Sequence, residues 1–155
     1  MQRIRSLPKF RNSATHIPYT ETMPDYIDRT GLLFIRDHKL LGARTKGKTT
    51  FYIPGGKREG NESDEECLAR EIKEELGVNV IPGSVIPYKL YVDEADGKPA
   101  GTMLHMRTMF ASLESEPVPS SEIEEIAWFS YGEVDRFGKI DRQIFEDLYK
   151  DNYIR

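Results

Sequence analysis

Residues 56–78 read GKREGNESDEECLAREIKEELGV, and this stretch decides the fold that we expect for the chain. Over 63–76 an apolar residue returns at every fourth position, which predicts one long helix with a single apolar stripe. Gly77 follows at the place where a glycine commonly ends a helix. The stretch therefore predicts a loop, a helix and a turn. The apolar stripe consists of Leu68, Ile72 and Leu76.

The predicted helix carries many more acidic than basic side chains. From Glu62 to Glu75 there are seven acids and only two bases. On a helical wheel, Glu71, Glu74 and Glu75 fall within one arc of about 100°, beside the apolar stripe. Like charges three or four positions apart destabilise an isolated helix by about 0.2–0.5 kcal/mol per pair. A solvated acidic face is one explanation, and a hard divalent cation that offsets the repulsion is the other.

With the glycines that flank the helix, the stretch resembles the Nudix box, G-x5-E-x7-R-E-U-x-E-E-x-G-U, in which U is an aliphatic residue. Every defined position of the pattern is matched. The resemblance extends through the PGGK lead-in and, more weakly, to the Trp128-Phe129 strand, but it does not include residues 1–24. The matching residues are Gly56, Glu62, Arg70, Glu71, Ile72, Glu74, Glu75, Gly77 and Val78.

Hydrophobic periodicity outside the box predicts further strands and one closing helix. The order of elements implies an α/β fold, and the resemblance makes it a Nudix-like α/β/α sandwich with a mixed central sheet and the box as loop-helix-loop. The predicted strands cover 32–35, 39–43, 49–53, 85–92, 102–113 and 123–129, with a hairpin joining the fourth and fifth, and the closing helix includes Ile140, Ile144, Phe145 and Leu148.

By this resemblance, the chain hydrolyses a nucleoside diphosphate linked to another group, with water as the nucleophile and Mg²⁺ or Mn²⁺ as cofactor. Glu71 is either a metal ligand or the base that orients and deprotonates the water. Arg70 lies one turn before Glu74 and is expected to hold that carboxylate. Glu62 begins the helix and is expected to support the loop, with a catalytic role as the alternative. The implied metal ligands are the Gly56 carbonyl, Glu71, Glu74 and Glu75.

The family usually recruits one more acid from outside the box. Glu122, Glu124 and Glu125 precede or begin the last predicted strand, where alternation would place Glu122 and Glu124 on one face and Glu125 on the other. We predict Glu122 as the second catalytic acid. Arg44 and Lys57 are cations upstream of the predicted helix and are predicted to bind substrate phosphates, with a solvated surface position as the alternative.

Composition excludes several other classes of protein. The chain has 155 residues, 38% of them hydrophobic, which is room for one compact domain. A net charge of -4 argues against general nucleic-acid binding, and the longest apolar run, 32–35, is far too short to cross a membrane. Cys67 is the only cysteine, so an internal disulfide and a thiolate zinc cage are excluded. A reducing cytoplasm is the expected location.

Charge divides the chain into two parts. Residues 1–24 hold four basic residues against one acid, so this arm is net +3 and the remainder is -7. Pro8 and Pro18 interrupt the amphipathic helix that an organelle transit peptide would need. We predict a basic arm over 1–24 and a Nudix hydrolase domain over 25–155, and a homodimer stays open.

The substrate is predicted by exclusion. The proline typical of ADP-ribose hydrolases and the tyrosine typical of dinucleoside polyphosphate hydrolases would fall near residues 93–96, which are Asp, Glu, Ala and Asp. A chain without these markers resembles members that convert a nucleoside triphosphate to the monophosphate and pyrophosphate. Hydrolysis of a nucleoside diphosphate sugar or ADP-ribose is the alternative, and a non-catalytic Nudix-like binding module is a third reading that the intact box disfavours.

Overall fold

The computed structural model describes residues 26–155, so the predicted arm over 1–24 lies outside the described residues. The elements in chain order are β1 (Tyr26–Leu33), β2 (Ile35–Arg36), β3 (Lys39–Thr45), β4 (Gly55–Lys57), α1 (Asp64–Leu76), β5 (Ile86–Glu94), β6 (Met103–Phe110), β7 (Ile123–Phe129), the 3-10 helix η1 (Tyr131–Arg136) and α2 (Lys139–Lys150).

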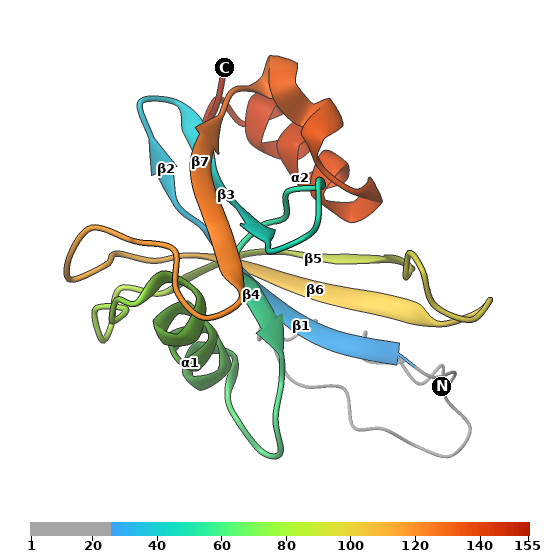
Figure 1. The fold of residues 1–155 in the computed structure, drawn as a ribbon, viewed down its shortest axis with the longest axis horizontal. Helices are drawn as coiled ribbons and strands as arrows, with labels where there is room; N and C mark the ends of the chain where they lie inside the picture. Colours follow the sequence, from blue (N-terminus) through green and yellow to red (C-terminus); the bar gives the residue numbers. More distant parts are fainter. Residues whose placement is uncertain (1–25) are drawn as a thin grey trace, which may run out of the picture.

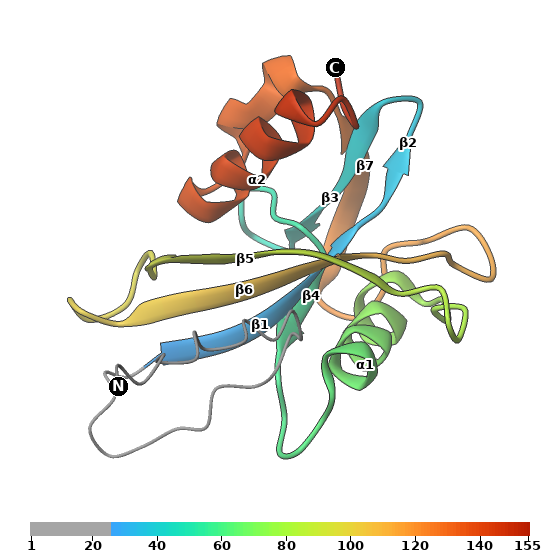
Figure 2. The same ribbon diagram turned by 180° about the vertical axis from the view of Figure 1, so that it is seen from behind.

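The strands form two sheets between two helical layers. A four-stranded sheet has the order β4-β1-β6-β5, and a three-stranded sheet has the order β2-β3-β7. The β1–β6 pair is parallel and every other pair of the larger sheet is antiparallel, so that sheet is mixed. Helices α1 and α2 lie on opposite faces of it (Figures 1 and 2). This arrangement confirms the predicted α/β/α fold with a mixed sheet.

Two apolar cores separate the layers. Side chains that alternate along β1 contribute to both cores. Leu32 packs with Ile72 of α1 in one core, whereas Leu33 packs with Phe145 of α2 in the other. Each of these side chains is almost completely buried. The two faces of β1 therefore contribute to different cores.

Helix α1 begins and ends where the sequence predicts. Ser63 is the N-cap, and its side chain and that of Glu66 form a reciprocal capping box, a cap that typically contributes about 1 kcal/mol. Gly77 ends the helix with a left-handed φ of 66°. Among residues 26–155, neither α1 nor α2 is long and apolar enough to cross a membrane.

The predicted strand over 49–53 is wrong. This segment contributes only isolated bridges, Ala43 with Tyr52 and Phe51 with Phe137. The Phe51 amide donates to the carbonyl of Arg136, a residue of η1, so its hydrogen bond does not extend a ladder. The chain instead crosses between the sheets and enters the loop before β4. The hairpin of β5 and β6, the strand β7 and the closing helix α2 agree with the predictions to within a few residues.

Candidate active site

A cavity of about 570 Å³ opens where α1 meets β4 and the loop after it. It brings Glu71 and Glu75 of the box together with Glu122, the acid that we predict outside the box. Segments far apart in the chain therefore supply acids to one space. The lining residues are Arg29, Thr45, Tyr52, Gly55, Gly56, Lys57, Glu59, Glu71, Glu75 and Glu122.

Glu75 is the most enclosed acid of this cavity. It is 2% exposed because it follows Ile72 by three positions and so lies at the edge of the buried stripe. The Gly55 amide donates to one carboxylate oxygen at 2.8 Å, and the Tyr52 hydroxyl donates to the other at 2.9 Å. Burial raises the pKa of Glu75 to about 7; the nearby charge of Glu71 also raises it, whereas the two hydrogen bonds lower it. Burial on this face of the helix thus favours the protonated, neutral form of Glu75.

Two glycines allow the loop to approach the helix so closely. Gly55 has a φ of 145°, and a Cβ there would lie 2.0 Å from the Thr30 carbonyl oxygen. A Cβ on Gly56 would lie 2.2 Å from the carboxylate carbon of Glu71. Any other residue at position 56 would therefore displace the Glu71 carboxylate.

Arg70 fixes the orientation of Glu71. Its Nη1 lies 2.8 Å from Glu71 Oε1, its Nε lies 2.5 Å from Glu62 Oε1, and its Nη2 donates to the Lys57 carbonyl at 2.9 Å. The separation from Glu74 is longer, 3.6 Å. Arg70 therefore holds Glu62 and Glu71 more closely than Glu74, the partner expected from the sequence.

Glu62 and Glu74, the other two acids at defined positions of the box pattern, lie outside the lining of the cavity. Glu62 accepts hydrogen bonds from Arg70 and from the Glu59 amide, which together lower its pKa to about 2. This arrangement agrees with a supporting position in the loop. Glu74 is 55% exposed, so the structure does not gather all three helix acids around one point. Its role as a metal ligand stays a prediction.

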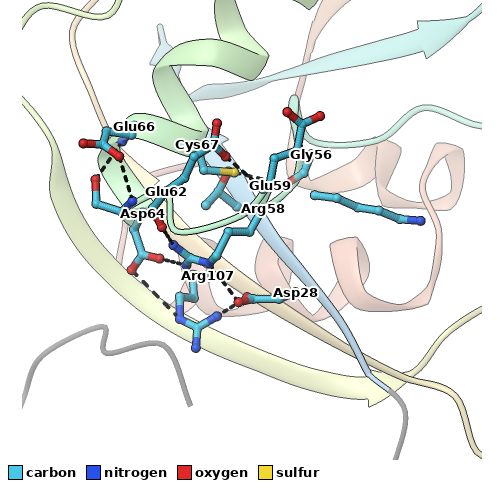
Figure 3. Close-up of polar contacts among 12 residues, drawn as sticks. Asp28, Gly56, Arg58, Glu59, Glu62, Asp64, Glu66, Cys67 and Arg107 are labelled. Carbon is cyan, nitrogen blue, oxygen red and sulfur yellow. Dashed lines mark hydrogen bonds and ion pairs between the residues drawn. The ribbon is translucent and has the colours of Figure 1, made fainter. Parts of the chain in front are cut away.

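A buried ion-pair network anchors the box loop to the sheet (Figure 3). Arg58 follows β4, and its guanidinium bonds Asp28 of β1 at 2.9 Å and also Asp64 at the start of α1. Arg107 of β6 bonds the other oxygen of Asp28. These charges lie in an enclosed environment, where ion pairs are screened less than at the surface. The network holds the loop and the first turn of α1 in place relative to β1.

Glu122 reaches the cavity from the turn before β7. A hydrogen bond from the Ser121 side chain lowers the pKa of Glu122. Glu124 and Glu125 instead form ion pairs with Arg44. Nη1 of Arg44 lies 3.0 Å from Oε2 of Glu124, and Nη2 lies 2.9 Å from Oε2 of Glu125. The expected alternation is wrong here because the β3–β7 register shifts at Arg44, so consecutive acids turn toward the same guanidinium.

The cations of the cavity differ in part from the expected ones. Lys57 lines it, but Arg44 does not, because Arg44 is occupied by its two acidic partners. Sequence reasoning missed Arg29, which lines the cavity from β1. No motif in the sequence marks Arg29; the structure places it on the face of β1 that turns toward α2, together with Ile27.

The oxygen donors suit a hard divalent cation. Within residues 26–155, no three acidic, histidine or cysteine side chains form a closed metal cage. Mg²⁺ does not require one, because it keeps several waters and is held by one or two carboxylates together with substrate phosphates. Glu71 and Glu75, with the Gly56 backbone beside them, supply such an open set of oxygens.

These features define an α/β/α sandwich protein in which the acidic box helix borders one cavity. Comparison with models of protein families shows the family to which it belongs. The model of the NUDIX domain matches residues 25–148, so the chain belongs to the Nudix family. The chain is 34% identical over 100 residues to the NAD-capped RNA hydrolase NudC of Stutzerimonas stutzeri. That match covers 63% of this chain but 34% of the relative, so the chain spans about a third of the relative's length.

Solved structures agree on the fold. The E. coli ORF135 protein superposes with a TM-score of 0.67 at 22% identity, covering 82% of this chain and 91% of that one. A MutT structure, from a study of the Aliivibrio salmonicida and Vibrio cholerae proteins, superposes with a TM-score of 0.64 at 18% identity. The match covers 82% of this chain and 99% of that one. A UDP-X diphosphatase superposes with a TM-score of 0.61 at 16% identity, and the match covers 92% of this chain and 68% of that one. At such identities the likeness concerns the fold alone.

Proposed function

We propose that this protein is a metal-dependent nucleotide pyrophosphohydrolase that converts a nucleoside triphosphate to the monophosphate and pyrophosphate. The observation that carries the proposal is the cavity in which Glu71, Glu75 and Glu122 meet the glycine loop of the box. Membership of the Nudix family supports the class of reaction.

The box residues would hold the cation. Glu71, Glu74, Glu75 and the Gly56 carbonyl are the proposed ligands, and either Mg²⁺ or Mn²⁺ suits these oxygens. When bound, the cation polarises a phosphoryl oxygen and lowers the pKa of a bound water. Glu74 would have to turn toward the cavity, which its exposure allows.

The protein's own side chains supply the geometry of the reaction. The Gly55 amide and the Tyr52 hydroxyl fix both oxygens of Glu75, so this ligand is oriented before substrate arrives. Glu71, held by Arg70, is the proposed base that orients the attacking water and accepts its proton. Glu122 lines the same cavity from the turn before β7 and is the proposed second acid.

Triphosphate is the proposed substrate because residues 93–96 lack the markers of the longer substrates. Charge agrees with a metal-bound form of it. The body of the chain is net -7 and repels free polyanions, whereas a triphosphate that carries a divalent cation has a smaller net charge.

A second candidate is hydrolysis of a nucleoside diphosphate joined to a sugar or to a second nucleoside. The relationship to a protein named NAD-capped RNA hydrolase favours it, since an NAD cap contains a pyrophosphate between two nucleosides. The same acids would serve either substrate, so the two candidates differ only in the group that leaves.

A nucleotide screen tests the proposal. The protein is incubated with nucleoside triphosphates, nucleoside diphosphate sugars, ADP-ribose and NAD in Mg²⁺, in Mn²⁺ and in EDTA, and the products are separated by chromatography. We expect monophosphate and pyrophosphate from at least one triphosphate with metal only. Turnover confined to ADP-ribose, sugars or NAD would support the second candidate, and no turnover of any compound would contradict the hydrolase assignment.

A further inference from the structure

A second cavity of about 320 Å³ adjoins the acid-lined one. The two share Arg29, Tyr52 and Lys57, so they meet at these side chains. The second cavity lies between β1, β6, the end of β5 and the first turn of α2. Its apolar wall consists of Ile27, Ile53, Leu104, Met106 and Ile140. Its size and apolar wall suit a nucleoside.

Arg29 stands at the junction with almost all of its hydrogen-bonding capacity unused. Its Nε is buried and has no hydrogen-bond partner, and Nη2 reaches only the Gly55 carbonyl at 3.5 Å. Among residues 26–155, it makes no ion pair, whereas Arg58 and Arg70 each contact carboxylates at 2.9 Å or less. Arg29 is therefore a cation that the folded protein leaves available on the wall of both cavities.

Leaving such a group without a partner is costly. A buried donor without an acceptor destabilises the fold, and native proteins rarely tolerate one without a reason. Counter-charge for buried acids is one reason, because Arg29 opposes the burial that raises the pKa values of Glu75 and Asp141. That role does not explain why its donors contact neither carboxylate. An anionic ligand at the junction explains both the charge and the open donors.

We propose that Arg29 binds the phosphate that is attached to the nucleoside, with the nucleoside in the second cavity and the remaining phosphates beside the acids. This inference rests on the proposed function and deepens it by assigning each half of the substrate to one cavity. The planar guanidinium presents paired N–H donors that match two phosphate oxygens. Lys57, on the same junction, adds a second positive charge.

Equilibrium binding without metal tests this assignment separately from catalysis. AMP, GMP, CMP and UMP and the four matching nucleosides are titrated in EDTA into wild type, Arg29→Gln and Arg29→Lys by calorimetry. For the monophosphate that wild type prefers, we expect Arg29→Gln to lose at least about tenfold in affinity, and Arg29→Lys to lose less because it keeps the charge. The affinity for the matching nucleoside stays within about twofold.

The ratio of the two affinities distinguishes phosphate binding from a structural role. A counter-ion role would weaken nucleoside and monophosphate equally or change only the melting temperature. Arg36→Gln is the matched control, because it removes the same charge from β2, where Arg36 pairs with Glu116. If Arg29→Gln does not fold, the test uses Arg29→Lys, for which we expect a smaller ratio of monophosphate affinity to nucleoside affinity than in wild type.

Two results would overturn the inference. One is equal monophosphate affinity in wild type and the folded Arg29 variants, and the other is no monophosphate binding by wild type at millimolar concentration. Neither result affects metal-dependent hydrolysis in the nucleotide screen. Conversely, a selective loss in Arg29→Gln without any hydrolysis by wild type would leave the phosphate site standing and contradict the proposed function.

Discussion

Asp141 allows a quantitative prediction of how stability depends on pH. It lies in the first turn of α2, is 7% exposed and accepts a backbone hydrogen bond from Ile53. Burial raises the pKa of Asp141 from 3.8 to about 7, against the opposing effects of that hydrogen bond and of Arg29. We therefore expect Asp141→Asn, which resembles the neutral carboxyl group in shape, to remove a pH-dependent loss of stability.

The raised pKa of Asp141 determines the sign and the size of its effect on the unfolding free energy. Because the pKa of the folded state is the higher one, the carboxyl stabilises the fold fully below pH 3.8 and loses that contribution as the pH rises through 7. A shift of about three units at about 1.4 kcal/mol per unit gives at most about 4 kcal/mol. Of this, about 3 kcal/mol falls between pH 4.5 and pH 8.

Urea unfolding of wild type and Asp141→Asn at several pH values measures the effect. The unfolding free energy of the variant minus that of wild type should increase by about 3 kcal/mol between pH 4.5 and 8. Taking the difference cancels every group that titrates alike in both proteins, including Glu75. A difference that stays within about 1 kcal/mol over this range would show that Asp141 is not buried as a neutral acid.

Three substitutions in the candidate site have distinct expected outcomes. Glu71→Gln should lower kcat by about two orders of magnitude with a much smaller change in KM, and a wild-type rate would exclude it as the base. Gly56→Ala should lower kcat by roughly 100-fold because its Cβ would meet the Glu71 carboxylate, and steady-state kinetics on folded protein decides this. Glu122→Gln should lower kcat by about tenfold or more, whereas the control Glu124→Gln, which removes only a partly exposed ion pair with Arg44, should change it less than about twofold; equal effects would contradict the assignment of Glu122.

The local elements of the fold could be predicted because their signals are contiguous in sequence. Helix α1 has its apolar stripe and its terminal glycine within 63–77, and the structure confirms both of them. The prediction of a strand over 49–53 was wrong. Its β-branched and aromatic residues favour an extended chain, but long-range pairing decides whether an extended chain joins a sheet.

The site was less predictable, because distances between side chains depend on packing. The wheel places Glu71, Glu74 and Glu75 on one face, but it does not show that the Gly55 amide and the Tyr52 hydroxyl cover Glu75 while Glu74 stays exposed. Arg29 gave no motif, and its importance becomes visible only where two cavities meet.

Hydrolysis in water labelled with oxygen-18 tests the proposed reaction directly. A nucleoside triphosphate is turned over with Mg²⁺ in labelled water, and mass spectrometry locates the label in the products. We expect monophosphate and pyrophosphate, one labelled oxygen in only one of them, and loss of the reaction in EDTA and in Glu75→Gln. Nucleoside diphosphate with orthophosphate as the sole products, or labelled product formed equally well in EDTA, would contradict the proposed reaction.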